Sequence, residues 1–202
     1  MPLQRNEFIP QSITTVYSSP SGLTDIRTGA PYQMGGLYPG TYFDLTEAEA
    51  QALSSNLHTG RYRFVQIDSA ATAANIKQGT IGLMKSLAGG VNLITSYDQG
   101  LNGGIRPVVF LGTVTSAQVS AGAYVFVQEA GDASVLMKSS LTNGAPAAGD
   151  LVVSAATGVV DDPTQSTNLT YALEKLIIGT AEAAPTANTL CRVMLNLPVI
   201  QG

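Results

Sequence analysis

AGAYVFVQEAGDASVLMKSSLTNGAPAAGDLVVSAATGVVDD, residues 121–162, is the stretch that decides the fold class. Its apolar runs are short and rich in Val, Tyr, Phe or Leu, residues that favour strands; they span 123–127, 134–137 and 151–154. The segments between and after them carry Gly, Asn, Asp or Pro, which tolerate turn geometry; these are 129–132, 143–150 and 157–158. The stretch therefore predicts a meander of antiparallel strands separated by tight turns.

Further short apolar runs lie on both sides of this meander, at 61–67, 79–86, 105–114, 176–181 and 189–197. Turn residues recur about every ten positions, which is typical of a β-sandwich or β-barrel. The crossover helices that a parallel α/β sheet needs are missing from the pattern. We therefore predict an all-β fold, an antiparallel sandwich or barrel of about eight to ten strands.

Residues 44–57 give the one clear helix in the pattern. Thr46 and Glu49 have the spacing of a capping box, and Gly60 is a suitable breaker beyond the end of the helix. His58, the only histidine, follows the helix and is expected to contact its last carbonyl groups. We expect this helix to be a lid or connector, because it is short.

Residues 1–43 resemble an extended arm more than a compact unit. Prolines recur about every ten residues, which excludes long helices and central strands. The segment also contains aromatic residues that a disordered tail normally lacks. It is expected to lie against its own domain or against a neighbouring subunit, and the composition does not decide between the two. The expected organisation is an arm at 1–43, a helix and connector at 44–60, and a β-domain at 61–202.

Candidate partner-contact residues are the large apolar and aromatic side chains of this arm. They are Phe8, Ile9, Tyr17, Tyr32, Tyr38 and Tyr42. Arg61 and Arg63 join them, because alternation along a strand places both arginines on one face and Tyr62 and Phe64 on the other. That face could contact an acidic partner, with solvated arginines on a strand edge as the alternative. Both faces of residues 124–127 are apolar, which predicts burial on both sides, by a second sheet or by a sister subunit.

The chain is poor in charge, with 12% charged residues and a net charge of −4. A surface of small polar residues suits lasting contact with other subunits. Because the basic residues are scattered, nucleic acid is not an expected partner. No apolar run has transmembrane length, and residues 1–20 contain no apolar core of a secretory signal, so no membrane partner is expected. Cys191 is the only cysteine and is expected to be a small buried apolar residue.

No constellation of residues predicts catalysis, a cofactor or a metal, so the chain is not expected to be an enzyme. A single histidine cannot supply a triad, and the acidic residues near turns are expected to act as turn formers. These are Glu129, Asp132, Asp150, Asp161 and Asp162. Calcium at Asp161 and Asp162 is an alternative that no ligand spacing supports. A glycosidase needs two carboxylates facing each other across a cleft, and the absence of tryptophan counts against a sugar site.

Several features of residues 105–197 resemble the head decoration, or cement, proteins of tailed bacteriophages. They are a strand ending in Val127-Gln128 before a glycine, AAGDLVV at 147–153, Gly158-Val159, IGTA at 178–181, a proline turn and a last strand. The resemblance lies in the order and style of these segments.

The resemblance implies a non-catalytic virion protein that binds the outer capsid surface and stabilises the shell. It implies the major capsid protein as partner, self-association with a trimer favoured over a dimer, and a place on the capsid after synthesis in the host cytoplasm. A minor tail, baseplate or head-fibre β-domain is an alternative within virion structure. A carbohydrate-binding β-domain is an alternative from another class.

Overall fold

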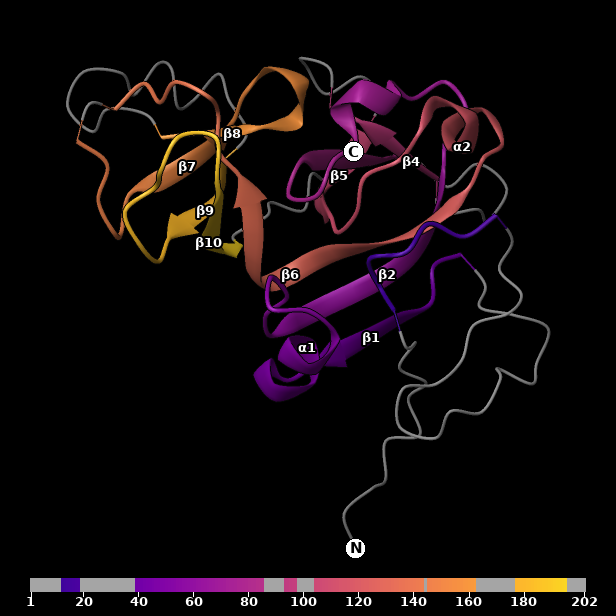
Figure 1. Ribbon diagram of the computed structural model, residues 1–202, viewed down its shortest axis with the longest axis horizontal. Coiled ribbons are helices and arrows are strands. Elements are labelled where there is room, and N and C mark those ends of the chain that lie inside the picture. The colour runs from indigo at the N-terminus through magenta and orange to yellow at the C-terminus, as the bar shows by residue number, and fades with distance from the viewer. Residues whose placement is uncertain are drawn as a thin grey trace, which may run out of the picture.

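The computed structural model describes residues 12–18, 39–85, 93–97, 104–143, 145–162 and 177–195. The fold is all-β with few helices, as expected from the sequence (Figure 1). The strands of the described chain are β1 (Tyr42–Leu45), β2 (Gly60–Ile67), β3 (Ile81–Lys85), β4 (Leu93–Ser96), β5 (Gly104–Phe110), β6 (Tyr124–Leu136), β7 (Leu151–Ser154), β8 (Val160–Asp161), β9 (Ile177–Ala181) and β10 (Leu190–Leu195). The helices are α1 (Glu47–Leu53) and α2 (Ser116–Ser120), with 3₁₀ turns η1 (Ala73–Asn75) and η2 (Ala156–Gly158).

Strands β2, β4, β3, β5 and β6 form a closed barrel, in which β6 pairs again with β2. Strand β1 extends the sheet beside the first half of β2. The pair β2–β4 is parallel and the other pairs of the barrel are antiparallel. The expected antiparallel barrel is therefore present, with one parallel pair in it.

A second sheet begins on the last part of β6 and continues through β10, β9, β7 and β8. Met137, directly after β6, forms a bridge with Val160 of β8, so this sheet also curls back toward its start. Figure 1 shows the second sheet beside the barrel, with β6 running from one into the other. The two β units therefore share one continuous strand.

The continuity of β6 corrects the meander predicted from the sequence. Residues 129–132 were expected to form a turn, but they lie inside a 13-residue strand. Gly131 has φ +87°, and a Cβ there would lie 2.4 Å from the Thr59 carbonyl oxygen and 2.6 Å from the Gly60 Cα. The glycine therefore permits a close approach of the paired strands β6 and β2 and does not reverse the chain.

Three clusters of buried side chains stabilise the two units. One fills the barrel and includes Val65 and Val127. A second lies on the outside of β2 and β6, where β1, α1 and residues 12–18 cover Phe64 and Phe126. The third fills the second sheet and takes in Val109 from the barrel. Strand β6 contributes to all three clusters, and residues 125–127 are buried on both faces of the strand. Burial on both sides was expected, but the outer cover is β1, α1 and residues 12–18 of the same chain instead of a second sheet or a sister subunit.

Residues 12–18 pack on the body of their own chain. Ile13 is 1% exposed. The backbones of Tyr17 and Tyr124 exchange two hydrogen bonds of 2.8 Å, and the Tyr17 ring packs edge-on against Phe64 and Phe126. Strand β1 begins at Tyr42, so the boundary expected at residue 43 falls inside a strand. At least these parts of the expected arm belong to the β body.

The helix expected within residues 44–57 is α1, which spans only Glu47–Leu53, and Thr46 and Glu49 form its capping box as expected. His58 was expected to contact the last carbonyl groups of α1. Its Nδ1 instead lies 3.0 Å from the Glu47 carboxylate, in the first turn of that helix. Helix α2 was not expected from the sequence. It also has a capping box, formed by Thr115 and Gln118.

Candidate functional site

Tyr42, Arg61 and Arg63 gather on one face of β1 and β2. The strand register pairs Tyr42 with Arg63 and Asp44 with Arg61. The guanidinium carbons of Arg61 and Arg63 lie 4.7 and 5.3 Å from the centre of the Tyr42 ring, a cation–π arrangement. Tyr42 is 51% exposed, so the stack reaches the surface. The predicted common face of the two arginines is therefore present.

The charges of these two arginines are already neutralised within the chain. Arg61 donates to both oxygens of Asp44, at 2.9 and 3.2 Å. Arg63 donates to both oxygens of Glu129, at 2.7 and 2.9 Å, and Arg106 approaches the same carboxylate at 3.4 Å. The Glu129 side chain is fully buried. An acidic partner would have to displace these carboxylates to reach a guanidinium group.

The remaining predicted contact residues have different places. Tyr17 is half-buried between the aromatic rings on the outside of the barrel, so it serves the core of its own chain. Phe8, Ile9, Tyr32 and Tyr38 lie outside the described residues. Of the arm residues proposed as contacts, Tyr42 is thus the one that the described structure shows exposed.

Arg192 on β10 forms a second charged cluster that joins the barrel region to the second sheet. Its guanidinium lies 2.6 Å from Asp132, 2.6 Å from Glu182 and 3.4 Å from Glu47. A hydrogen bond from His58 is the main reason that the pKa of Glu47 is lowered. Asp132 belongs to β6 and Glu47 to α1, so the ion pairs of Arg192 connect β6 and α1 to β10.

A third polar cluster contains three buried carboxyl groups, those of Asp150, Asp161 and Asp162. Asp150 accepts from the Ala147 amide at 2.7 Å, as expected for a turn former. Asp161 lies in β8 and pairs with Lys138 at 3.0 Å, so its expected turn role is wrong. The same expectation is wrong for Glu129 and Asp132, which lie in β6 and bind distant arginines.

Asp162 lies beside Asp150, and Asn143 Nδ2 donates to both carboxyl groups at 3.1–3.4 Å. Burial is the main cause that raises the pKa of Asp162 to about 6, and the neighbouring carboxyls of Asp150 and Asp161 raise it further. Among the described residues, no group of His, Cys, Asp and Glu side chains has an arrangement that could hold a metal ion. The expected apolar setting of Cys191 is confirmed, since it is 6% exposed within the third core cluster.

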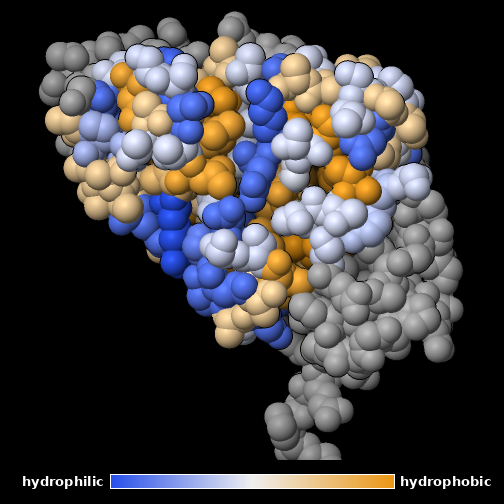
Figure 2. Space-filling view, in the orientation of Figure 1, coloured by the Kyte–Doolittle hydropathy of each residue, from blue (hydrophilic) through white to orange (hydrophobic). Residues whose placement is uncertain are grey.

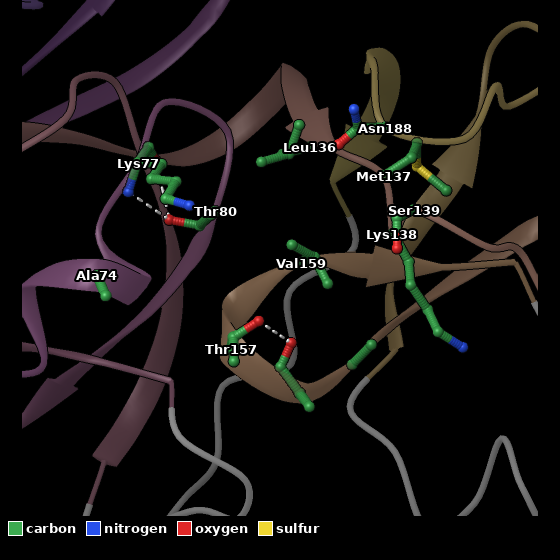
Figure 3. Close-up of a pocket in the computed structure, with 12 residues that line it drawn as sticks. Ala74, Lys77, Thr80, Leu136, Met137, Lys138, Ser139, Thr157, Val159 and Asn188 are labelled. Atoms are coloured by element: carbon green, nitrogen blue, oxygen red, sulfur yellow. Dashed lines mark hydrogen bonds between the residues drawn. The ribbon is translucent and has the colours of Figure 1, made fainter.

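A pocket of about 370 Å³ lies between the barrel and the second sheet, within the ~300–1,000 Å³ range of small-ligand sites (Figure 3). One wall comes from η1 and the loop before β3, and the others come from the end of β6, the β7–β8 connection and the β9–β10 turn. The lining residues are Ala74, Lys77, Thr80, Leu136, Met137, Lys138, Ser139, Ala155, Ala156, Thr157, Val159 and Asn188.

Two backbone positions at this pocket are unusual. Within the described ranges, Thr157 (φ 64°) and Asn188 (φ 58°) are the non-glycine residues with positive φ, and both line the pocket. Asparagine tolerates this conformation, but a β-branched threonine is strained there. The sequence indicated a turn at 157–158 and gave no sign that it would face Lys77, because the two segments meet only through the fold.

The two lysines of the pocket differ in charge pairing. Lys138 turns its ammonium group away from the other lining residues in Figure 3 and pairs with Asp161. Lys77 has no ion pair with any residue in the described part of the chain. The other described lysines and arginines all have one; they are Arg61, Arg63, Lys85, Arg106, Lys138 and Arg192.

Comparison with protein-family models, with curated proteins and with solved structures finds no match. None of the helices in the described ranges is both long and apolar enough to cross a membrane.

Proposed function

We propose that this chain is a capsid decoration protein of a tailed bacteriophage. In this role it binds the outer surface of the assembled shell and stabilises it without catalysis. The order of segments in residues 105–197 supports the resemblance to decoration proteins. The pairing of charged side chains within the chain supports a structural role.

The observation that carries the proposal is the internal pairing of charge. All described arginines and all described lysines except Lys77 lie beside a carboxylate of the same chain. A charge that is already paired within the chain loses less favourable hydration when the surface meets a neighbour than a free charge does. The cores of protein interfaces are likewise depleted in free charge. Such a surface suits persistent contact in many copies.

The architecture favours a body that resists deformation. Strand β6 belongs to both β units, and Arg192 adds ion pairs that connect α1, β6 and β10. Deforming the junction would break backbone pairing and buried packing together. On the face shown in Figure 2, hydrophobic patches alternate with polar ones, a mixture found in protein interfaces.

The proposed partners are the major capsid protein and further copies of this chain, with a trimer favoured over a dimer. Several weak contacts on a repeating shell add up to high avidity when copies are linked. The exposed Tyr42 stack with Arg61 and Arg63 is the proposed contact patch of the described surface, because aromatic and arginine side chains are enriched at such contacts.

The test adds purified full-length protein to phage shells that lack it. Saturable binding and a higher temperature of shell disruption are expected. Tyr42→Ala should weaken binding, while the matched variant Tyr97→Phe, at a buried tyrosine in the barrel region, should not. Absence of wild-type binding would refute the decoration role. Unchanged binding of Tyr42→Ala would refute only the contact patch.

A further inference from the structure

The pocket between the barrel and the second sheet has features that the proposed function does not use. Its walls come from four separate segments of the chain, so it exists only when both β units are folded and docked. Pockets that bind ligands often lie at junctions of this kind.

The first observation is electrostatic. Lys77 is exposed and is the single lysine or arginine, among the described residues, whose charge no described carboxylate neutralises. It lines the pocket beside Thr80, opposite Leu136 and Val159 (Figure 3). In a chain that pairs every other described cation, a free ammonium group at a cavity favours an external anion.

The second observation is conformational and independent of charge. Thr157 is held at φ 64° on the pocket wall, although a threonine is strained in that region. Strain of this kind tends to occur at binding sites, where the surrounding structure holds it. Asn188, the other described non-glycine residue with positive φ, lies on the same pocket.

The lining also limits the type of anion. Lys77 offers one positive charge, the charge of Lys138 is already paired with Asp161, and no arginine lines the pocket, so the lining balances one negative charge rather than the nearly two of a phosphate group. Leu136 and Val159 supply apolar surface next to it, while Ser139 and Asn188 supply exposed polar groups. A singly charged carboxylate on a short aliphatic stem matches this combination better than a phosphate does.

We propose that this pocket accepts the carboxylate side chain of an acidic segment from a protein partner, with Lys77 as its counter-ion. The aliphatic part of that side chain packs against Leu136 and Val159, and polar groups on the rim bind the partner backbone. The proposal does not require that the partner be a capsid protein. The carboxylate site and the decoration role can therefore be refuted separately.

The test uses NMR titration of the full-length, ¹⁵N-labelled protein with a blocked peptide, acetyl-Gly-Glu-Gly-amide. Saturable shifts of the Lys77, Ser139 and Asn188 amides are expected. The matched peptide with Gln in place of Glu should bind about two- to fivefold more weakly, because water screens an ion pair at an exposed lysine. Lys77→Ala should remove the preference for Glu, and Lys77→Arg should retain it.

Lys85→Ala is the control variant, because it removes the same charge away from the pocket lining. It should bind the Glu peptide as the wild type does. Equal binding of the Glu and Gln peptides, or equal loss in Lys77→Ala and Lys85→Ala, would overturn the proposal. Inorganic phosphate forms a third arm, and saturable binding of phosphate at these amides without binding of the peptide would also overturn it.

Discussion

Arg63 of β2 and Glu129 of β6 form a two-point ion pair across adjacent strands, with N–O distances of 2.7 and 2.9 Å. Glu129 has no exposed side-chain surface, and Arg63 has 18%. The pair is therefore largely removed from water, unlike the nearby pair of Arg61 and Asp44, which is about two-fifths exposed. Loss of the buried carboxylate should therefore cost more stability than loss of the exposed one.

Glu129→Gln should lower the free energy of unfolding by about 3 kcal/mol, because it leaves Arg63 and Arg106 without their shared counter-charge. Asp44→Asn removes an exposed partner and should cost at most about 1 kcal/mol. Urea denaturation of both variants measures the difference. Equal losses would show that burial of Glu129 does not determine the strength of the pair.

Gly131→Ala should be much more destabilising than Gly149→Ala. Both glycines have positive φ, +87° and +90°, so either alanine incurs the same backbone cost of about 1–2 kcal/mol. A Cβ at Gly131 would also meet the backbone of Thr59 and Gly60, whereas a Cβ at Gly149 meets nothing within 4 Å. Overpacking should add about 1–3 kcal/mol at Gly131. Equal unfolding free energies would contradict the close approach of β2 and β6 at Gly131.

Stability should fall as pH rises through about 6. The pKa of Asp162 is raised to about 6, so the folded state binds a proton there more strongly than the unfolded chain does. Its stabilising contribution is complete below the ordinary carboxyl pKa and is lost as pH passes the folded pKa.

Asp162→Asn should remove this decline, which we expect to be about 1–3 kcal/mol between pH 4 and pH 8. Asp68 and Glu47, whose pKa values are lowered, act in the opposite direction and matter only as pH falls below their ordinary range. Urea denaturation across this pH range measures the effect. A decline of the same size in the variant would assign the titration to another group.

Ile13→Ala should lower the free energy of unfolding by about 2–5 kcal/mol, because Ile13 is 1% exposed within the outer core cluster. Thr15→Ala, at an exposed neighbour, should change it by no more than about 0.5 kcal/mol. A deletion that tests the arm should accordingly end at residue 11, so that the core is kept. An unchanged stability of Ile13→Ala would place residues 12–18 outside the folded body.

Local patterns predicted the strands well where burial alternates along them. Cys191 and Val193 face the core, and Arg192 and Met194 face outward, as the alternation in β10 indicated. Arg61–Phe64 behaves in the same way, with Tyr62 and Phe64 fully buried. Period-two patterns succeed in these two segments because one face of the strand is covered and the other is open.

The errors came from residues whose partners are far away in the sequence. Glu129, Gly131 and Asp132 have the composition of a turn, but Arg63 and Arg192 neutralise the two acids inside a strand. The pocket could not be predicted for the same reason. Lys77 and Thr157 carry no local signal, and they meet only because the second sheet docks on the barrel.

The copy number of this chain in purified phage particles tests the central claim most directly. Quantitative mass spectrometry against the major capsid protein gives this number. A decoration protein should be present in a number of copies comparable with that of the shell protein. Conditions that strip proteins from the outer surface of the particle should release it. A handful of copies per particle would indicate a tail or fibre component, and absence from the particle would contradict the proposed function.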